Sequence, residues 1–133
     1  MSEAVLDSSA ILALLLAETG AEAVRASLPE ALLSTVNFAE VVAKLTERGM
    51  PIAEARAAVE STGIKMVDFD ADQAAMTGEL RPETGAIGLS LGDRACLGLA
   101  RMRGLPALTV DTAWAQAPGF HVVLIRGGGA GPA

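Results

Sequence analysis

Four acidic residues stand where a predicted element ends or begins, and they are the side chains of this sequence best suited to chemistry. They are Asp7, Glu40, Asp93 and Asp111. Asp7 and Asp111 each follow an apolar run that predicts a buried strand, whereas Glu40 and Asp93 fall in the first turn of a predicted helix. Ligands of open α/β sheets bind beyond the carboxyl ends of the strands. We therefore expect all four acids on one edge of a sheet.

Each acid also has an ordinary structural explanation when it is taken alone. Asn37-x-x-Glu40 and Ser90-x-x-Asp93 both have the spacing of a capping box, in which the acid accepts a hydrogen bond from the helix start. Asp7 alone could cap the helix that follows it. Together the acids favour a site, because carboxylates at one edge repel each other and each loses hydration. Such a cluster needs a cation or a proton to neutralise it.

A cluster of carboxylates without a useful His or Cys suits a hard ion such as Mg²⁺ or Mn²⁺ rather than zinc. Such an ion supports phosphate chemistry, because it lowers the pKa of a bound water and neutralises phosphate oxygens. The glycine-rich phosphate loops G-x-x-x-x-G-K-[ST] and G-x-G-x-x-G are missing from the sequence. The only lysines are Lys44 and Lys65, and neither fits the last-strand lysine of a response-regulator receiver.

The acids must be positioned by strands and helices that alternate along the chain. Apolar runs predict strands over Ala4–Leu6, Ala31–Thr35, Ile64–Phe69, Pro106–Val110 and His121–Ile125. Helices are predicted over Ala10–Glu18, Ala21–Leu28, Phe38–Arg48, Ile52–Thr62, Asp70 or Asp72 to Leu80, and Ser90–Arg103, with a helical turn at Thr112–Gln116. This alternation predicts an α/β fold with a mostly parallel, five-stranded sheet covered on both faces.

Composition fits one globular domain, because 133 residues with 51% apolar side chains can bury a real core. We expect the domain over residues 1–126 and a flexible glycine-rich tail over 127–133. The net charge of −6 argues against a protein that binds nucleic acid through electrostatic attraction alone. A single cysteine, Cys96, fits a reducing compartment and reads as a buried structural thiol. The apolar run Ala10–Ala17 is too short to span a membrane, so we expect a cytoplasmic protein.

Four segments in order resemble the PIN domain and, more narrowly, the VapC-type toxin ribonucleases of type II toxin–antitoxin systems. They are Val5–Glu18, Ser34–Leu45, Leu89–Ala100 and Leu108–Trp114. The resemblance implies a three-layer α/β/α sandwich and an endoribonuclease that needs Mg²⁺ or Mn²⁺. It also implies a homodimer and a cognate VapB-type antitoxin as partner.

The resemblance assigns roles to the four acids by position. Asp7, Asp93 and Asp111 match the family's metal ligands, Asp111 binding directly or through a water, and all four acids match its catalytic residues. Glu40 would orient the attacking water, or it would hydrogen-bond to a group that binds the metal without binding the metal itself. Water activated by the metal would then hydrolyse the RNA phosphodiester bond.

Several neighbours of the acids could contribute. Ser8, Ser9 and Thr109 could hydrogen-bond to the acids or to a metal-bound water, with capping or strand roles as the alternative. Arg94 could pair with a carboxylate or touch RNA, with a structural or solvated ion pair as the alternative. Trp114 is predicted to anchor the core rather than to stack on a base.

Two other functions compete with the ribonuclease toxin. One is a PIN-like module that binds RNA or an antitoxin without turnover, and the other is a metal-dependent phosphatase or DNA nuclease. Partner binding has a physical basis, because Ala10–Glu18 and Phe38–Arg48 are unusually apolar and a groove between them would accept an amphipathic helix. An acidic site mouth would also attract a basic segment.

Overall fold

The chain forms a five-stranded sheet in the order β3-β2-β1-β4-β5, and every neighbouring pair is parallel. The computed structural model describes residues 3–112, 114 and 119–125. The strands are β1 (Ala4–Leu6), β2 (Ala31–Ser34), β3 (Lys65–Val67), β4 (Ala107–Thr109) and β5 (Val122–Leu124). Leu6 is in register with both Leu33 and Leu108. The carboxyl ends of β1, β2 and β4 therefore lie level with one another.

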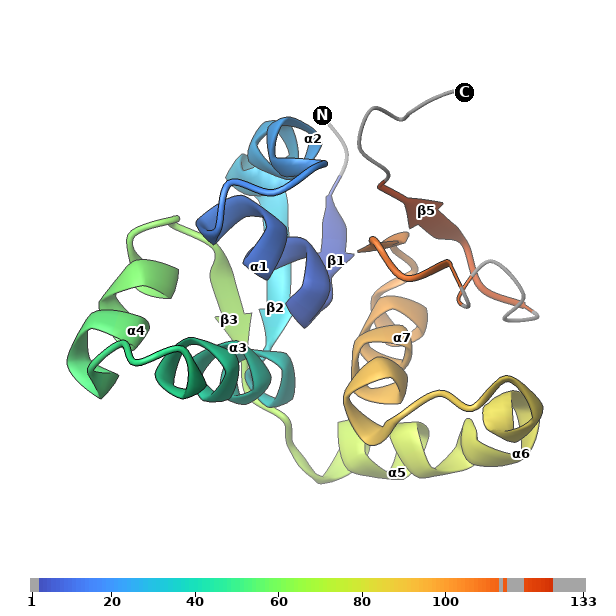
Figure 1. Cartoon of the computed structure of the whole chain (residues 1–133). Helices are drawn as coiled ribbons and strands as arrows, with labels where there is room; N and C mark the ends of the chain where they lie inside the picture. The colour runs from blue at the N-terminus through green and yellow to red at the C-terminus, as the bar shows by residue number, and fades with distance from the viewer. Residues whose placement is uncertain (1–2, 113, 115–118, 126–133) are drawn as a thin grey trace.

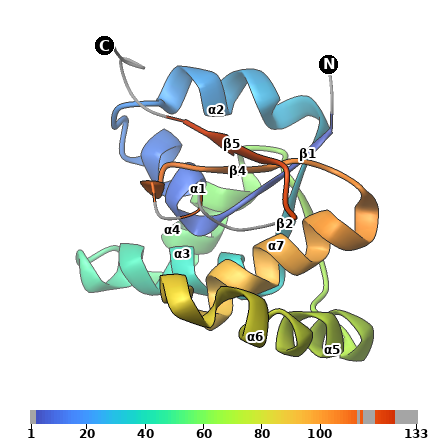
Figure 2. The same ribbon diagram turned by 90° about the vertical axis from the view of Figure 1, so that its right-hand side faces the viewer.

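Helices connect β1 to β2, β2 to β3 and β3 to β4, and they cover the two faces of the sheet. They are α1 (Ser8–Leu15), α2 (Ala21–Ser27), α3 (Thr35–Glu47), α4 (Ile52–Glu60), α5 (Ala71–Glu79), α6 (Arg81–Thr84) and α7 (Leu91–Arg103), with 3-10 turns η1 (Leu28–Glu30) and η2 (Gly85–Ile87). In Figure 1, α1 lies in front of the central strands and α3 and α4 lie below them and to the left, while α5, α6 and α7 lie to the lower right. Figure 2 shows the same arrangement turned by 90°.

The central strands are apolar on both faces, which explains why helices cover both. Leu6 and Leu33 pack into one core with Ile11 of α1, whereas Val5 and Leu32 pack into a second core with Leu97 of α7. Alternate residues of a strand point to opposite faces, so each buried strand contributes to both cores. The predicted α/β class and three-layer sandwich are confirmed.

Two predicted helix starts were wrong, because residues nearer the strands form the caps. Helix α1 begins at Ser8 rather than at the predicted Ala10, because Asp7 forms its cap, as the structural alternative for this acid proposed, and accepts a hydrogen bond from the Ala10 N–H. Ser34 caps α3 by accepting from the Val36 N–H at 3.2 Å, so this helix begins before Asn37. Asn37 therefore lies inside α3 and is not a cap. By contrast, Ser90 and Asp93 do form the predicted capping box of α7.

Other predictions have mixed outcomes. Trp114 and Cys96 are both fully buried, as predicted. Part of the helical turn predicted at 112–116 and all of the tail at 127–133 lie outside the described residues. Among the residues that the structure describes, no helix combines the length and apolar character needed to cross a membrane.

Candidate active site

Asp7 lies at the carboxyl end of the central strand β1 and is only 3% exposed. One carboxylate oxygen accepts hydrogen bonds from the Ala10 N–H at 2.9 Å and from the Ser9 hydroxyl at 2.8 Å. The other accepts from the Thr109 hydroxyl at 2.6 Å. Neutral donors from α1 and β4 thus fix the orientation of this carboxylate.

The same hydroxyl groups connect Asp7 to the turn that carries Asp111. The Asp111 N–H donates to Thr109 Oγ1 at 3.0 Å, and the Val110 N–H donates to Ser9 Oγ at 3.2 Å. Ser9 Oγ and Thr109 Oγ1 lie 3.3 Å apart. Ser9 and Thr109 therefore join the ends of β1 and β4, which brings the exposed Asp111 to the edge where Asp7 lies.

Ser8 differs from Ser9, although both were candidates. It is the first residue of α1 and is half-buried. The described side-chain hydrogen bonds to Asp7 come from Ser9 and Thr109. The structure therefore places Ser9 and Thr109, but not Ser8, in contact with this acid.

Glu40 projects from α3 toward the beginning of α7. Its Oε1 accepts a hydrogen bond from Asn37 Nδ2 at 2.9 Å, and the same nitrogen donates to the Gly92 carbonyl at 3.1 Å. A Cβ atom on Gly92 would overlap the Glu40 carboxylate. Glu40 thus lies directly against the backbone that leads into Asp93.

Asp93 lies in the first turn of α7, where it closes the capping box. Its carboxylate accepts from the Ser90 N–H at 3.0 Å, and its own N–H donates to Ser90 Oγ at 3.2 Å. The capping role and a site role are compatible, because a carboxylate has more lone pairs than one amide uses. The side chain is half-buried, so part of it faces solvent.

The acids influence one another electrostatically, which places them in one cluster. Burial raises the pKa of Asp7 to about 6, hydrogen bonds from Thr109, Ala10 and Ser9 oppose the rise, and the charge of Asp93 adds to it. Burial also raises the pKa of Asp93, and the charges of Asp111 and Glu40 raise it further. The four acids that lie apart in the sequence are therefore neighbours in the fold.

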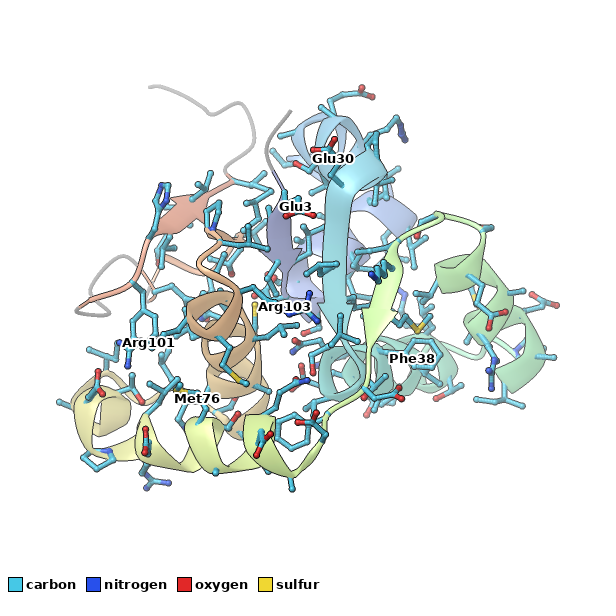
Figure 3. All side chains as sticks on the ribbon, turned by 180° about the vertical axis from the view of Figure 1, so that it is seen from behind. Glu3, Glu30, Phe38, Met76, Arg101 and Arg103 are labelled. Atoms are coloured by element: carbon cyan, nitrogen blue, oxygen red, sulfur yellow. The ribbon has the colours of Figure 1, made fainter. Side chains whose placement is uncertain are left out.

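Arg94 and Arg101, in the same helix as Asp93, use their side chains for contacts away from its carboxylate. Arg94 follows Asp93 but is 8% exposed, and its Nη1 donates to the Thr77 carbonyl at 3.1 Å rather than to a carboxylate. Arg101 pairs with Glu83 at 3.3 Å and stacks over Phe120, on the α6 side shown in Figure 3. Among the described residues, Asp7, Glu40 and Asp93 make no ion pair.

The donor set fits a hard divalent cation by its chemistry. Carboxylate oxygens are the ligands that Mg²⁺ prefers, and a bound cation would offset the burial that raises the pKa of Asp7. The positions of the side chains do not yet form a full set of metal ligands. Within residues 3–112, 114 and 119–125, no three His, Cys, Asp or Glu side chains converge to hold one ion. The cluster therefore has suitable ligands for Mg²⁺ or Mn²⁺ but not a closed three-ligand cage.

Sequence reasoning missed the contact of Asn37 and Gly92 with Glu40. Asn37 was interpreted as a helix cap, and its hydrogen bond to Gly92 spans 55 positions in the sequence. One local signal was present, since a glycine inside a predicted helix suggests a close approach by another group.

Comparison with known proteins assigns the fold to a family. A search of curated proteins by sequence gives no match. Among solved structures, a toxin–antitoxin complex from Klebsiella pneumoniae is 25% identical, with a TM-score of 0.74 over 93% of this chain and 98% of that one. The VapC20 sarcin-ricin loop cleaving toxin of Mycobacterium tuberculosis is 27% identical, with a TM-score of 0.75 over 94% and 99%.

A DNA-bound VapBC structure from Salmonella typhimurium shares the fold at 22% identity, with a TM-score of 0.71 over 92% of this chain and 98% of that one. The profile of the PIN domain family matches residues 4–119, which is most of the chain. This match covers β1 and the elements that carry Asp7, Glu40, Asp93 and Asp111. The chain is a member of the PIN domain family.

Proposed function

We propose that this protein is the metal-dependent endoribonuclease toxin of a toxin–antitoxin pair. The observation that carries the proposal is the gathering of Asp7, Glu40, Asp93 and Asp111 at one edge of the sheet, where burial and neighbouring charges raise the pKa values of Asp7 and Asp93. Membership of a nuclease family and similarity to structures of toxins support it.

Asp7 and Asp93 would hold the ion, and Asp111 would bind it directly or through a water. A bound divalent ion supplies positive charge for the phosphate oxygens and acidifies a water. Ser9 and Thr109 fix the orientation of the Asp7 carboxylate, because their hydroxyls donate hydrogen bonds to both of its oxygens. Glu40 would accept a proton from the attacking water at a carboxylate oxygen. With the ion bound, these residues would support hydrolysis of an RNA phosphodiester bond by water.

The partner proposed is an antitoxin of the VapB type, because similar structures include toxin–antitoxin complexes. The structure places an apolar groove between α3 and α4, whereas the sequence predicted one between the first helix and α3. Leu14 of α1 and Val42 of α3 are both half-buried, so the domain does not wholly cover either of these two apolar helices. The groove has a volume of about 340 Å³ and is lined by Phe38, Ala39, Val42, Ala43, Ile52 and Arg56. A homodimer and a cytoplasmic location complete the proposal, the latter because Cys96 is a free thiol.

The test uses purified, partner-free protein incubated with total RNA and Mn²⁺ or Mg²⁺. An oligonucleotide of the sarcin-ricin loop is a second substrate, because a similar toxin cleaves that loop. Parallel reactions contain EDTA, Asp93→Asn or Asp72→Asn. The last is a matched control, since Asp72 is an exposed acid in the first turn of α5, just as Asp93 lies in the first turn of α7.

We expect cleavage of RNA that requires both the metal and Asp93 and that survives in Asp72→Asn. Reactions with single-stranded DNA and with p-nitrophenyl phosphate separate the competing enzymes. Equal turnover of either substrate by a metal-dependent route would favour a DNA nuclease or phosphatase. Binding of RNA without cleavage, alike in wild type and Asp93→Asn, would favour a module without turnover.

A further inference from the structure

Asn37 is not one of the four acids, yet it connects two of the helices that carry them. Its side chain is 0% exposed. Its Nδ2 donates to Glu40 Oε1 at 2.9 Å within α3 and to the Gly92 carbonyl at 3.1 Å in α7. Gly92 immediately precedes Asp93. One buried amide therefore connects the placement of Glu40 to the backbone that places Asp93.

We propose that Asn37 is a positioning residue that, together with the bare Cα of Gly92, holds the Glu40 carboxylate beside Asp93. The inference rests on the proposed function, because the placement of Glu40 matters for turnover only if the cluster acts on RNA. It assigns Asn37 no contact with the substrate. Its effect on cleavage is exerted through Glu40.

The hydrogen-bonding partners determine which way the Asn37 amide faces. A carboxylate oxygen and a backbone carbonyl both accept, so only the NH₂ group can serve them. The Oδ1 atom then points away, and it has no hydrogen-bond partner among the described residues. This arrangement leaves a buried acceptor unsatisfied, which costs free energy. If residue 37 only had to form part of α3, Ala or Leu would do so without leaving a buried acceptor unsatisfied.

Gly92 supplies the second half of the placement. The three atoms nearest to a Cβ built on Gly92 all belong to the Glu40 carboxylate. A side chain at position 92 and Glu40 in its present position therefore exclude each other. The backbone of Gly92 is helical, so the need for glycine comes from this close approach and not from an unusual φ angle.

The alternative is that Asn37 only helps α3 pack against α7. A double-mutant cycle separates the two roles, because a positioning role of Asn37 acts through Glu40 and has no effect on cleavage once Glu40 is removed. The full chain is prepared without its partner as wild type, Asn37→Ala, Glu40→Ala and the double variant. Mn²⁺ affinity is measured by calorimetry, cleavage by kcat and KM, and folding by thermal unfolding.

We expect Asn37→Ala to lower kcat by about 10- to 100-fold with little change in KM, as removal of a supporting contact does at metal sites. In the Glu40→Ala background the same change should have little further effect on kcat. Losses that are equal in the two backgrounds, or no loss at all, would overturn the inference while leaving the ribonuclease intact.

Gly92→Ala keeps the test decisive if Asn37→Ala folds poorly. It should lower the unfolding temperature and kcat when Glu40 is present, and the unfolding cost should vanish with Glu40→Ala because the overlap is gone. An unfolding cost that persists without Glu40 would overturn the inference. If wild type neither binds Mn²⁺ nor cleaves RNA, the proposed function fails, and the unfolding temperatures of these variants alone decide whether the placement is real.

Discussion

The Thr109 hydroxyl donates a hydrogen bond to the Asp7 carboxylate at 2.6 Å, and this contact joins the ends of two adjacent parallel strands. Thr109 is fully buried, and its Oγ1 also accepts from the Asp111 N–H at 3.0 Å. One side chain therefore orients Asp7 and fixes the start of the turn that bears Asp111. The site depends on the level ends of β1 and β4 as much as on the acids.

Replacing Thr109 with Val keeps the shape of the side chain and removes this donor. We expect the free energy of unfolding to fall by about 2 kcal/mol, because a buried carboxylate loses a hydrogen bond. We expect RNA cleavage to fall about 10- to 100-fold, because the carboxylate is no longer aimed. Thr109→Ser, which retains the hydroxyl, is the matched control. Full cleavage by Thr109→Val would show that this hydrogen bond is dispensable.

The pKa of Asp7 predicts how the stability of the metal-free protein varies with pH. Burial raises this pKa to about 6 from an ordinary 3.8, so the folded chain holds a proton more tightly than the unfolded chain. Stability must then fall as pH rises from about 4 to 6 and level off above that. The contribution of Asp7 to the free energy of unfolding should be about 1 kcal/mol larger at pH 5 than at pH 7.5.

Denaturant unfolding in EDTA at both pH values measures this contribution. Asp7→Asn is the control, because an amide does not titrate and the difference attributable to residue 7 should disappear. Asp93 contributes in the same direction, since its pKa is also raised. An identical pH dependence in wild type and Asp7→Asn would contradict the proposed ionisation of Asp7.

Divalent cations should stabilise the protein most where Asp7 is ionised. At a free Mn²⁺ concentration about 100 times the dissociation constant, the gain is about 2.7 kcal/mol. The gain should be smaller at pH 5, because protons compete for Asp7 and Asp93. Thermal unfolding with Mn²⁺ or with EDTA at pH 5 and 7.5 measures both effects. Stabilisation that Asp93→Asn retains in full would place the ion elsewhere.

Arg94 should matter for stability and not for cleavage. Its guanidinium is buried between α5 and α7, where it bonds to the Thr77 carbonyl. We expect Arg94→Ala to lower the free energy of unfolding by about 2 kcal/mol, through lost packing and an unpaired carbonyl. Cleavage per folded molecule should stay within about twofold of wild type, equivalent to less than about 0.5 kcal/mol in activation free energy. A selective loss of kcat in the folded protein would instead support a contact with RNA.

Two motifs with the same spacing show how far sequence reasoning reaches. Ser90-x-x-Asp93 is a capping box in the structure, as its local pattern predicts. Asn37-x-x-Glu40 is not, because Ser34 at the end of β2 starts the helix earlier and turns Asn37 inward. The alternation of strands and helices predicts the parallel sheet, and the edge rule for such sheets predicts that the acids lie near one another, but neither predicts the order of the strands in the sheet.

Contacts between distant segments could not be predicted in this way. Asn37 meets Gly92, and Ser9 meets Thr109, only once the helices and strands have packed. The spacing of residues along the sequence does not reveal contacts between segments so far apart. Propensity and pattern therefore predict where the acids lie, but not the hydrogen bonds that hold them. The apolar groove shows the same limit, because it depends on the position of Ile52 in α4 against Phe38 in α3.

The most direct test of a metal-dependent ribonuclease is the rate of RNA cleavage as a function of Mn²⁺ concentration, measured beside Mn²⁺ binding to the same preparation. We expect cleavage to reach half its maximum near the dissociation constant for Mn²⁺. Asp93→Asn should shift both the cleavage and the binding curve to higher concentrations or abolish them, while Asp72→Asn should leave both unchanged. Cleavage that persists in EDTA, or that Asp93→Asn retains at the wild-type rate, would contradict a metal-dependent ribonuclease at this cluster.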